Sequence, residues 1–386
     1  MARITVERNI AYDDVRNKFY VTLHYGVEDG KQIRKTKTFT SKREAQRVLR
    51  EFEGKKVMQQ IVMPKNYTLS EWLESWLREF VLNKKAKTTY SGYRYIVDNH
   101  IMPKIGTIRL QELNEEVLEG YFNEQRNVFD AKGKRRLSDN TLRKHYVLLQ
   151  TALQKAVHRK LIKSNPLEHV EAPVYTKPKI NFYTFEQSLE ILRKVDNDFI
   201  LKPTVYLALY TGLRREEIAG LQWSDIDFAN SIISITRARV RAGNEIVIKG
   251  PKNKSSERSI FMCERLSKVL KEVREIQLDS KELLGNLYSD TDYVVVNQYG
   301  KEINPGYLSS LFGKFVKKNN LPKITLHGLR HTAASIMYDD GVTIEKISDI
   351  LGHADITTTD RIYTHRYNRT HEDVMTAYGK KLDIKD

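Results

Sequence analysis

The sequence predicts a mainly helical α+β chain in three parts. Residues 1–58 are expected to form a small β-sheet module with one helix, residues 66–172 a helical bundle, and residues 180–386 a mixed, mainly helical domain with a short β-sheet. Strand-like alternation near the N-terminus and apolar residues at helical spacing over most of the remainder predict these elements. Two proline-containing stretches with little apolar content mark the boundaries between the parts.

The composition indicates a polyanionic partner. The 386 residues carry a formal net charge of +16 at pH 7 and a pI near 9.5, which favours nucleic acid but does not separate DNA from RNA. Cys263 is the only cysteine, so an internal disulfide is impossible and a reducing compartment is expected. The sequence shows neither a membrane-spanning apolar run nor a signal peptide. We therefore expect a soluble cytoplasmic protein without a membrane partner.

The N-terminal module is predicted from two alternating stretches, 19–25 and 33–39, joined by a turn. A helix then starts near Thr40, with its apolar side toward the strands. Exposed basic residues on a strand are commonly no more than a solvated face. A basic strand can also enter a DNA groove, and the candidates for this contact are Arg34, Lys35 and Lys37.

Apolar residues at helical spacing predict the bundle of residues 66–172. One long helix is expected from Ser138 to Lys160, with five inward residues: Leu142, Val147, Leu149, Leu153 and Val157. Basic residues and one threonine at the bundle's edges are candidates for phosphate contacts, which fix a protein's register on DNA: Lys84, Lys85, Lys87, Thr88, Lys134, Arg135 and Arg136.

The third part mixes helices with short strands. Helices are predicted over 185–195, within 203–219, over 266–284 and from Asn304-Pro305 onward. Strands are predicted over 232–235, 245–248, 258–262 and 293–296.

The stretch 326–365 gathers groups suited to phosphate chemistry. His327 and Arg330 are three residues apart at a predicted helix start, where they point the same way and backbone N–H groups favour an anion. Gly352 breaks the next helical pattern and leaves His353 at a bend. A threonine run with Asp360 would cap a short helix that carries Tyr363.

Other uses of these residues are common. A lone histidine near a helix start is usually structural, and a tyrosine in an amphipathic helix is usually packing. His327 and His331 also have the i, i+4 spacing of zinc ligands. However, Gly328 stands where a metalloprotease has glutamate, and cysteines or carboxylate clusters are lacking nearby. We therefore expect neither a metal nor another cofactor.

Three motifs of this stretch resemble the tyrosine recombinase (phage integrase) family: His327-x-x-Arg330, Leu351-Gly352-His353 and the following Tyr363. Two more family elements precede them in the family's order. One is Thr211-Gly212-Leu213-Arg214, and the other is the lysine segment Lys252-x-Lys254-Ser-x-x-Arg258. The resemblance extends from about residue 68 to the C-terminus.

The resemblance implies a set of catalytic residues: Tyr363, Arg214, Lys252, His327, Arg330 and His353. Tyr363 would attack a DNA phosphodiester and form a 3′-phosphotyrosine, while the two arginines stabilise the charge that builds up. Lys252 would protonate the leaving 5′ oxygen, and His327 would assist proton transfer. His353 would hydrogen-bond the phosphate, and Glu217 would orient an arginine or nearby backbone.

Two assignments depend on the family motif. Arg215 follows Arg214 directly, and the residue types alone do not rank the two. Lys249 and Lys254 are likewise rivals of Lys252 for the role of general acid.

The resemblance also implies a biological setting. Residues 1–58 would bind arm-type DNA sites, residues 66–172 core sites, and residues 180–386 would form the catalytic domain, all on double-stranded DNA. Val374, Met375 and Tyr378 lie on one face of a predicted tail helix, which implies docking on a neighbouring protomer and a homotetramer on DNA. An accessory DNA-bending or excision factor could join it.

Within the family, the N-terminal module favours an integrase/excisionase of a phage or mobile element, acting in the bacterial cytoplasm. Three alternatives stay open. They are a chromosome-dimer or plasmid resolvase, a type IB topoisomerase-like enzyme, and a catalytically silent DNA-binding regulator.

Overall fold

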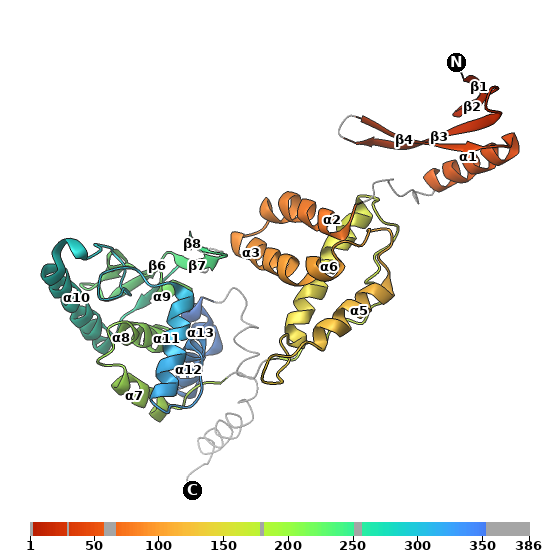
Figure 1. Ribbon diagram of the computed structural model, residues 1–386. Helices are drawn as coiled ribbons and strands as arrows, with labels where there is room; N and C mark the ends of the chain where they lie inside the picture. The colour runs from red at the N-terminus through yellow and green to blue at the C-terminus, as the bar shows by residue number, and fades with distance from the viewer. Residues whose placement is uncertain (1–2, 29–30, 58–66, 178–180, 251–256, 353–386) are drawn as a thin grey trace, which may run out of the picture. The chain divides into compact units, whose positions relative to one another are not determined.

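The computed structural model describes residues 3–28, 31–57, 67–177, 181–250 and 257–352. The chain divides into two compact units, Met1–Lys177 and Pro178–Asp386 (Figure 1). Helices dominate and the sheets are small, which confirms the predicted mainly helical α+β class. Within the described residues, every helix is too short or too polar to cross a membrane.

The N-terminal module is a four-stranded antiparallel sheet in the order β1-β2-β3-β4, followed by α1. Its elements are β1 (Ile4–Glu7), β2 (Ile10–Asp13), β3 (Lys18–Glu28), β4 (Lys31–Phe39) and α1 (Lys42–Val57). Ile10, Val21, Leu23 and Ala45 form its buried core. The sequence predicts β3, β4 and α1 but misses the two four-residue strands, which are too short to show a clear alternation.

The bundle contains α2 (Leu69–Trp76), α3 (Lys87–Ile96), α4 (Met102–Ile105), α5 (Glu115–Arg126) and α6 (Asp139–His158), with π-helical turns η1 (Leu77–Leu82) and η2 (Val97–Ile101). The Trp72 indole donates to the carbonyl of Ala152 at 3.0 Å and ties α2 to α6. One inward prediction is wrong, because Val147 is 44% exposed. His145, two residues earlier, is buried and bonded to the Tyr121 hydroxyl at 2.9 Å.

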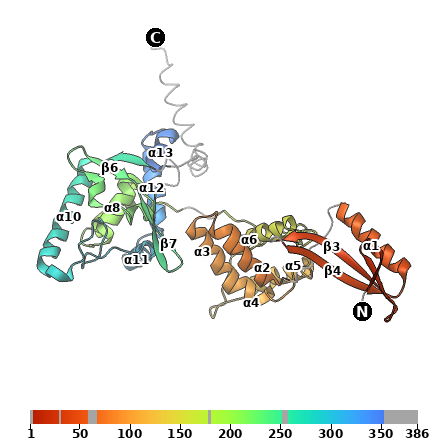
Figure 2. The same cartoon turned by 90° about the horizontal axis from the view of Figure 1, so that it is seen from above.

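The second unit opens with α7 (Phe185–Lys194), α8 (Leu201–Thr211) and α9 (Arg215–Ile218), and it later contains α10 (Glu264–Leu284), α11 (Pro305–Lys318), α12 (Leu326–Asp339) and α13 (Ile344–Leu351). Helix α8 lies between α10 and α12 (Figure 2), and most of its residues are buried. It therefore forms the centre of this unit's core, and this packing fixes the position of its C-terminal end.

Two small antiparallel sheets accompany these helices. One pairs β5 (Ile226–Asp227), β6 (Ile232–Ile235) and β9 (Arg258–Phe261), and the other is the hairpin of β7 (Ala238–Ala242) and β8 (Glu245–Lys249). The strand predicted over 293–296 is wrong. Val294, Val295 and Val296 are buried, but the stretch 293–296 forms only isolated bridges, at Tyr293 and at Val296.

Candidate active site

Arg330 is a fully buried arginine in the first turns of α12. The Thr325 hydroxyl caps this helix by accepting the N–H of Gly328 at 3.0 Å, and buried Leu326 and Leu329 fix the first turn against the core. Arg330 is only 1% exposed. It donates to the carbonyl oxygens of Gly212 at 2.7 Å and Leu351 at 2.8 Å, which supplies the acceptors that a buried cation requires.

Arg214 reaches the same place from the end of α8. That helix stops at Gly212, which has a left-handed φ of 63°, and Arg214 then caps α9. Its Nη2 donates to the carbonyl of Gly352 at 2.8 Å, and its Nη1 donates to Glu217 Oε1, also at 2.8 Å.

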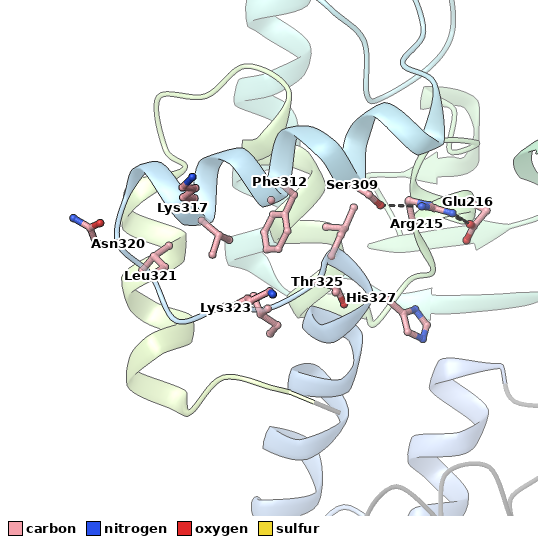
Figure 3. A pocket seen from close by; sticks show the side chains of 14 residues that line it. Arg215, Glu216, Ser309, Phe312, Lys317, Asn320, Leu321, Lys323, Thr325 and His327 are labelled. Carbon is pink, nitrogen blue, oxygen red and sulfur yellow. Dashed lines mark hydrogen bonds and ion pairs between the residues drawn. The ribbon is translucent and has the colours of Figure 1, made fainter. Parts of the chain in front are cut away.

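The structure separates Arg214 from its neighbour. Arg215 donates to the Ser309 hydroxyl at 2.9 Å and to the Glu216 carboxylate, and both partners line a groove that His327 also lines (Figure 3). Arg214, not Arg215, therefore joins Arg330 at the end of α13, a distinction that the residue types alone could not make.

A third arginine, Arg258 on β9, completes this arrangement. It donates to the carbonyl of Ile350 at 2.8 Å, so the three successive carbonyls of Ile350, Leu351 and Gly352 each accept from a different arginine. The C-terminal end of a helix carries partial negative charge, which favours cations there. Sequence reasoning placed Arg258 in the lysine segment but gave it no role. An inward position on a short strand is the only signal it offers.

Glu217 is the carboxylate of this network. It accepts from the backbone N–H of Arg214 at 2.9 Å and from the guanidinium groups of Arg214 and Arg258. Burial acts to raise the pKa of the Glu217 carboxyl, but Arg258 and Arg214 outweigh it and hold the pKa below its usual value. With Glu217 ionised, the network of three guanidinium groups and one carboxylate keeps an excess of positive charge, which suits a phosphate.

His327 stands at the exposed start of α12, on the same helix as Arg330. Partial burial of the ring, and next the positive charge of Arg330, lower the pKa of His327 below its usual value. The ring of His331 lies edge-on at 4.8 Å between centroids, and burial lowers the pKa of His331 to about 4. The lowered pKa values favour the neutral form of both rings, and a neutral imidazole can accept a proton. Within the described residues, groups of three or more metal-ligating side chains are absent.

A groove of about 1150 Å³ opens beside His327 (Figure 3). Its wall is apolar where α11 contributes Phe312 and Val316, and Lys317 and Lys323 add positive charge. Three predicted catalytic residues, Lys252, His353 and Tyr363, lie outside the described residues.

The predicted DNA contacts of the N-terminal module are all exposed but do not share one face. Lys35 pairs with Leu23 and Lys37 with Val21, and both partners point toward α1 in the core. Arg34 pairs with His24 and lies on the opposite, open face of the sheet, because successive strand residues alternate.

In the bundle, the predicted contacts gather at two places. Lys84, Lys85 and Lys87 are exposed at the turn into α3. Thr88 and Arg136 line one groove of about 800 Å³ together with the basic residue Lys144. The other two predicted contacts of the basic loop are Lys134, which is exposed, and Arg135, which is paired with Asp139 at 3.2 Å.

Comparison with known proteins yields three family models in order along the chain. An arm DNA-binding domain model matches residues 9–56, a phage integrase N-terminal SAM-like domain model matches residues 68–125, and the phage integrase family model matches residues 181–369. A tyrosine recombinase XerC-like protein of Caldanaerobacter subterraneus is 27% identical over 88% of this chain and 89% of its own length.

Two solved structures share the fold. The Tn1549 transposon integrase in complex with a circular intermediate DNA has a TM-score of 0.64 at 21% identity, covering 80% of this chain and 99% of the other. A lambda integrase tetramer bound to a Holliday junction has a TM-score of 0.57 at 16% identity, covering 92% and 98%. With three family models matched in order and the arginine motifs brought together at one helix end, the chain belongs to the phage integrase family and is a tyrosine recombinase.

Proposed function

We propose that this protein is the integrase/excisionase of a phage or mobile element, which cleaves and rejoins DNA through a 3′-phosphotyrosine on Tyr363. The observation that carries the proposal is the meeting of Arg214 and Arg330 on the adjacent carbonyls of Gly352 and Leu351. Two guanidinium groups held side by side with an excess of positive charge suit the non-bridging oxygens of a phosphodiester.

The remaining roles follow from residue chemistry. Neutral His327 beside the arginines can assist proton transfer at the tyrosine, and Lys252 can protonate the leaving 5′ oxygen, since a lysine pKa falls when arginines crowd it. His353, directly after the anchored Gly352, would hydrogen-bond the phosphate. The phosphotyrosine conserves the energy of the broken bond, so rejoining would need neither ATP nor a metal ion.

The N-terminal sheet supports a mobile-element integrase over the alternatives. A second DNA-binding module lets one protein bridge distant sites, which neither a resolvase nor a type IB topoisomerase-like enzyme requires. The match of residues 9–56 to an arm DNA-binding model and the likeness to a transposon integrase agree with this choice. A catalytically silent regulator would have no use for the arginine network.

We assign the DNA contacts by domain. Residues 1–58 would bind arm sites, with Arg34 on the open face of the sheet and Lys35 and Lys37 at its edge, and residues 66–172 would bind core sites. The bundle's contacts would come from Lys84, Lys85, Lys87, Thr88, Lys134, Arg135 and Arg136. Residues 180–386 would cleave the strand.

We further propose a tetramer on DNA in the bacterial cytoplasm, with a DNA-bending or excision factor as an accessory partner. The likeness to a lambda integrase tetramer on a Holliday junction supports the assembly. The tail that would dock on a neighbouring protomer, with Val374, Met375 and Tyr378, lies outside the described residues.

The test uses a duplex that carries the element's junction sequence, with a nick just beyond the cleavage phosphate. Wild type and Tyr363→Phe are incubated with it in EDTA. A protease-sensitive covalent adduct at the 3′ phosphate is expected with wild type only. Tight binding of the validated site without any adduct would leave a DNA-binding protein and overturn the recombinase assignment.

A further inference from the structure

Arg258 contacts the two elements that hold the Arg214 side chain, which are α9 with Glu217 and the end of α13. Its Nη2 and Nη1 donate to Glu217 Oε2 at 3.0 Å and Oε1 at 3.3 Å, and its Nε donates to the carbonyl of Ile350 at 2.8 Å. The side chains of Arg258 and Glu217 are 8% and 7% exposed. One guanidinium therefore links the start of α9 to the end of α13.

Those two elements are also the anchors of Arg214. Its Nη1 donates to Glu217 and its Nη2 to the carbonyl of Gly352, two residues beyond the carbonyl that Arg258 holds. Any shift of Glu217 relative to the end of α13 would pull apart the two acceptors of Arg214. Arg258 is placed to prevent that shift without taking the place of Arg214.

The contact requires an arginine. A guanidinium is a rigid fork that can bind a carboxylate along one edge while its Nε points elsewhere, whereas a lysine ammonium is a single point charge. The fit against α13 is also tight, because a Cβ on Gly352 would lie 2.8 Å from Arg258 Nη1. Gly352 has a left-handed φ of 66°, so a glycine is suited to this position for two reasons.

We propose that Arg258 is a positioning residue for strand cleavage: it clamps Glu217 to the end of α13 and so fixes the direction of the Arg214 guanidinium. The inference rests on the proposed recombinase function. Electrostatic stabilisation of a transition state depends on donors that are already in place when charge develops. Loss of the clamp should therefore slow cleavage more than it weakens DNA binding.

The experiment measures single-turnover formation of the covalent adduct by the full chain on the nicked duplex described above. With Arg258→Gln we expect a rate lower by about 10- to 100-fold, the scale of a small displacement of a catalytic group, and a DNA dissociation constant within about threefold of wild type. Arg258→Lys should recover part of the rate, because an ammonium can hold one of the two partners. This variant carries the test if Arg258→Gln does not fold.

A double-mutant cycle with Glu217→Gln tests whether Arg258 acts through Glu217. The two substitutions should be clearly non-additive in the cleavage rate, because each breaks the same clamp. Additive effects would overturn the inference.

The pH dependence of the cleavage rate separates positioning from a general loss of stability, because a loss of stability alone would not shift that dependence. Among the described residues, the charged groups that face Glu217 are Arg258 from β9 and Arg214 from the start of α9. Without Arg258, the buried carboxylate loses one of its two cations and its pKa should rise. The acid limb of the rate profile should then move to higher pH in Arg258→Gln, but not when Glu217→Gln is also present.

Arg239→Lys is the matched control. Arg239 is another arginine of the same unit, 4% exposed, and it holds backbone carbonyls of Ala219 and Ile303 without contacting Glu217 or α13. Its substitution should leave the acid limb unchanged. An unchanged cleavage rate in both Arg258 variants would overturn positioning by Arg258. A loss of cleavage rate that is matched by weaker and less salt-dependent DNA binding would overturn it as well. An absent adduct with wild type would instead overturn the proposed function.

Discussion

Gly212 and Leu351 lie in direct contact, and a single guanidinium spans their carbonyl oxygens. A Cβ added to Gly212 would come within 2.4 Å of Leu351 Cδ2, and Arg330 donates to both carbonyls, at 2.7 and 2.8 Å. The glycine of the first arginine motif is therefore needed for its left-handed turn and also for the approach of α13. Since α8 ends here, the contact joins the core helix of this unit to the arginine network.

Gly212→Ala should destabilise the second unit by about 1 to 3 kcal/mol, because the new methyl group overpacks the contact with Leu351 in a backbone conformation that disfavours it. Urea denaturation followed by tryptophan fluorescence measures the change. Gly313→Ala in α11 is the control, since a Cβ there meets nothing within 4 Å and alanine favours the helix. Equal effects of the two substitutions would contradict the contact.

Glu217→Gln should cost about 1 to 3 kcal/mol at pH 7, the range for lost hydrogen bonds to a charged group. The folded-state pKa of Glu217 lies below its ordinary value, so its stabilisation is present above the unfolded pKa and is lost as pH falls through the folded pKa. The gap in stability between wild type and variant should therefore narrow in the acid range. Denaturation midpoints from pH 7 down to pH 3 would show this, and a constant gap would count against an ionised Glu217.

His331 should stay neutral down to about pH 4, the value to which burial lowers its pKa. The unfolded chain binds this proton nearer the ordinary histidine pKa of about 6.5, so the contribution of His331 to stability is complete above that pH and is lost as pH falls toward 4. Nuclear magnetic resonance titration of the ring protons gives the pKa directly, with His331→Gln assigning the signal. Titration near pH 6.5 would show that the ring is not desolvated.

Arg34→Gln should weaken binding to arm-site DNA and lower the slope of log affinity against log salt by about 1, as for one lost phosphate contact. Lys35→Gln should have a smaller effect, because Lys35 lies on the face that α1 occupies, opposite Leu23. Fluorescence anisotropy at several salt concentrations compares the two. A larger effect of Lys35 would mean that the sheet does not use its open face.

The sequence predicted secondary structure best where a local pattern controls geometry. His327 and Arg330 share a helix start because their spacing matches one turn, and α12 begins at Leu326 as that spacing requires. Long elements such as α6 were also predicted, since many periods of apolar residues accumulate along them. Val147 was wrongly predicted to be buried, because a periodic pattern does not show how much of the helix surface faces the core. The buried His145 occupies part of the core-facing surface instead.

Long-range partners could not be predicted in the same way. Arg258 and Ile350 are 92 residues apart in sequence, and an alternating four-residue strand does not reveal which distant residue its arginine will contact. Arg214 and Arg215 are identical in type and adjacent in sequence. Only the direction set by Gly212 and the N-cap of α9 sends one toward α13 and the other toward Ser309.

The three carbonyls at the end of α13 connect three arginines through one helix end. Their donors come from the start of α9, from β9 and from α12, so a movement of the end of α13 would disturb three contacts at once. A partial loosening of any contributor would release the helix end from all of them together. We therefore expect Arg214, Arg258 and Arg330 to pass between an assembled and a disassembled state in a single cooperative step, with few intermediates in which only one of them is in place.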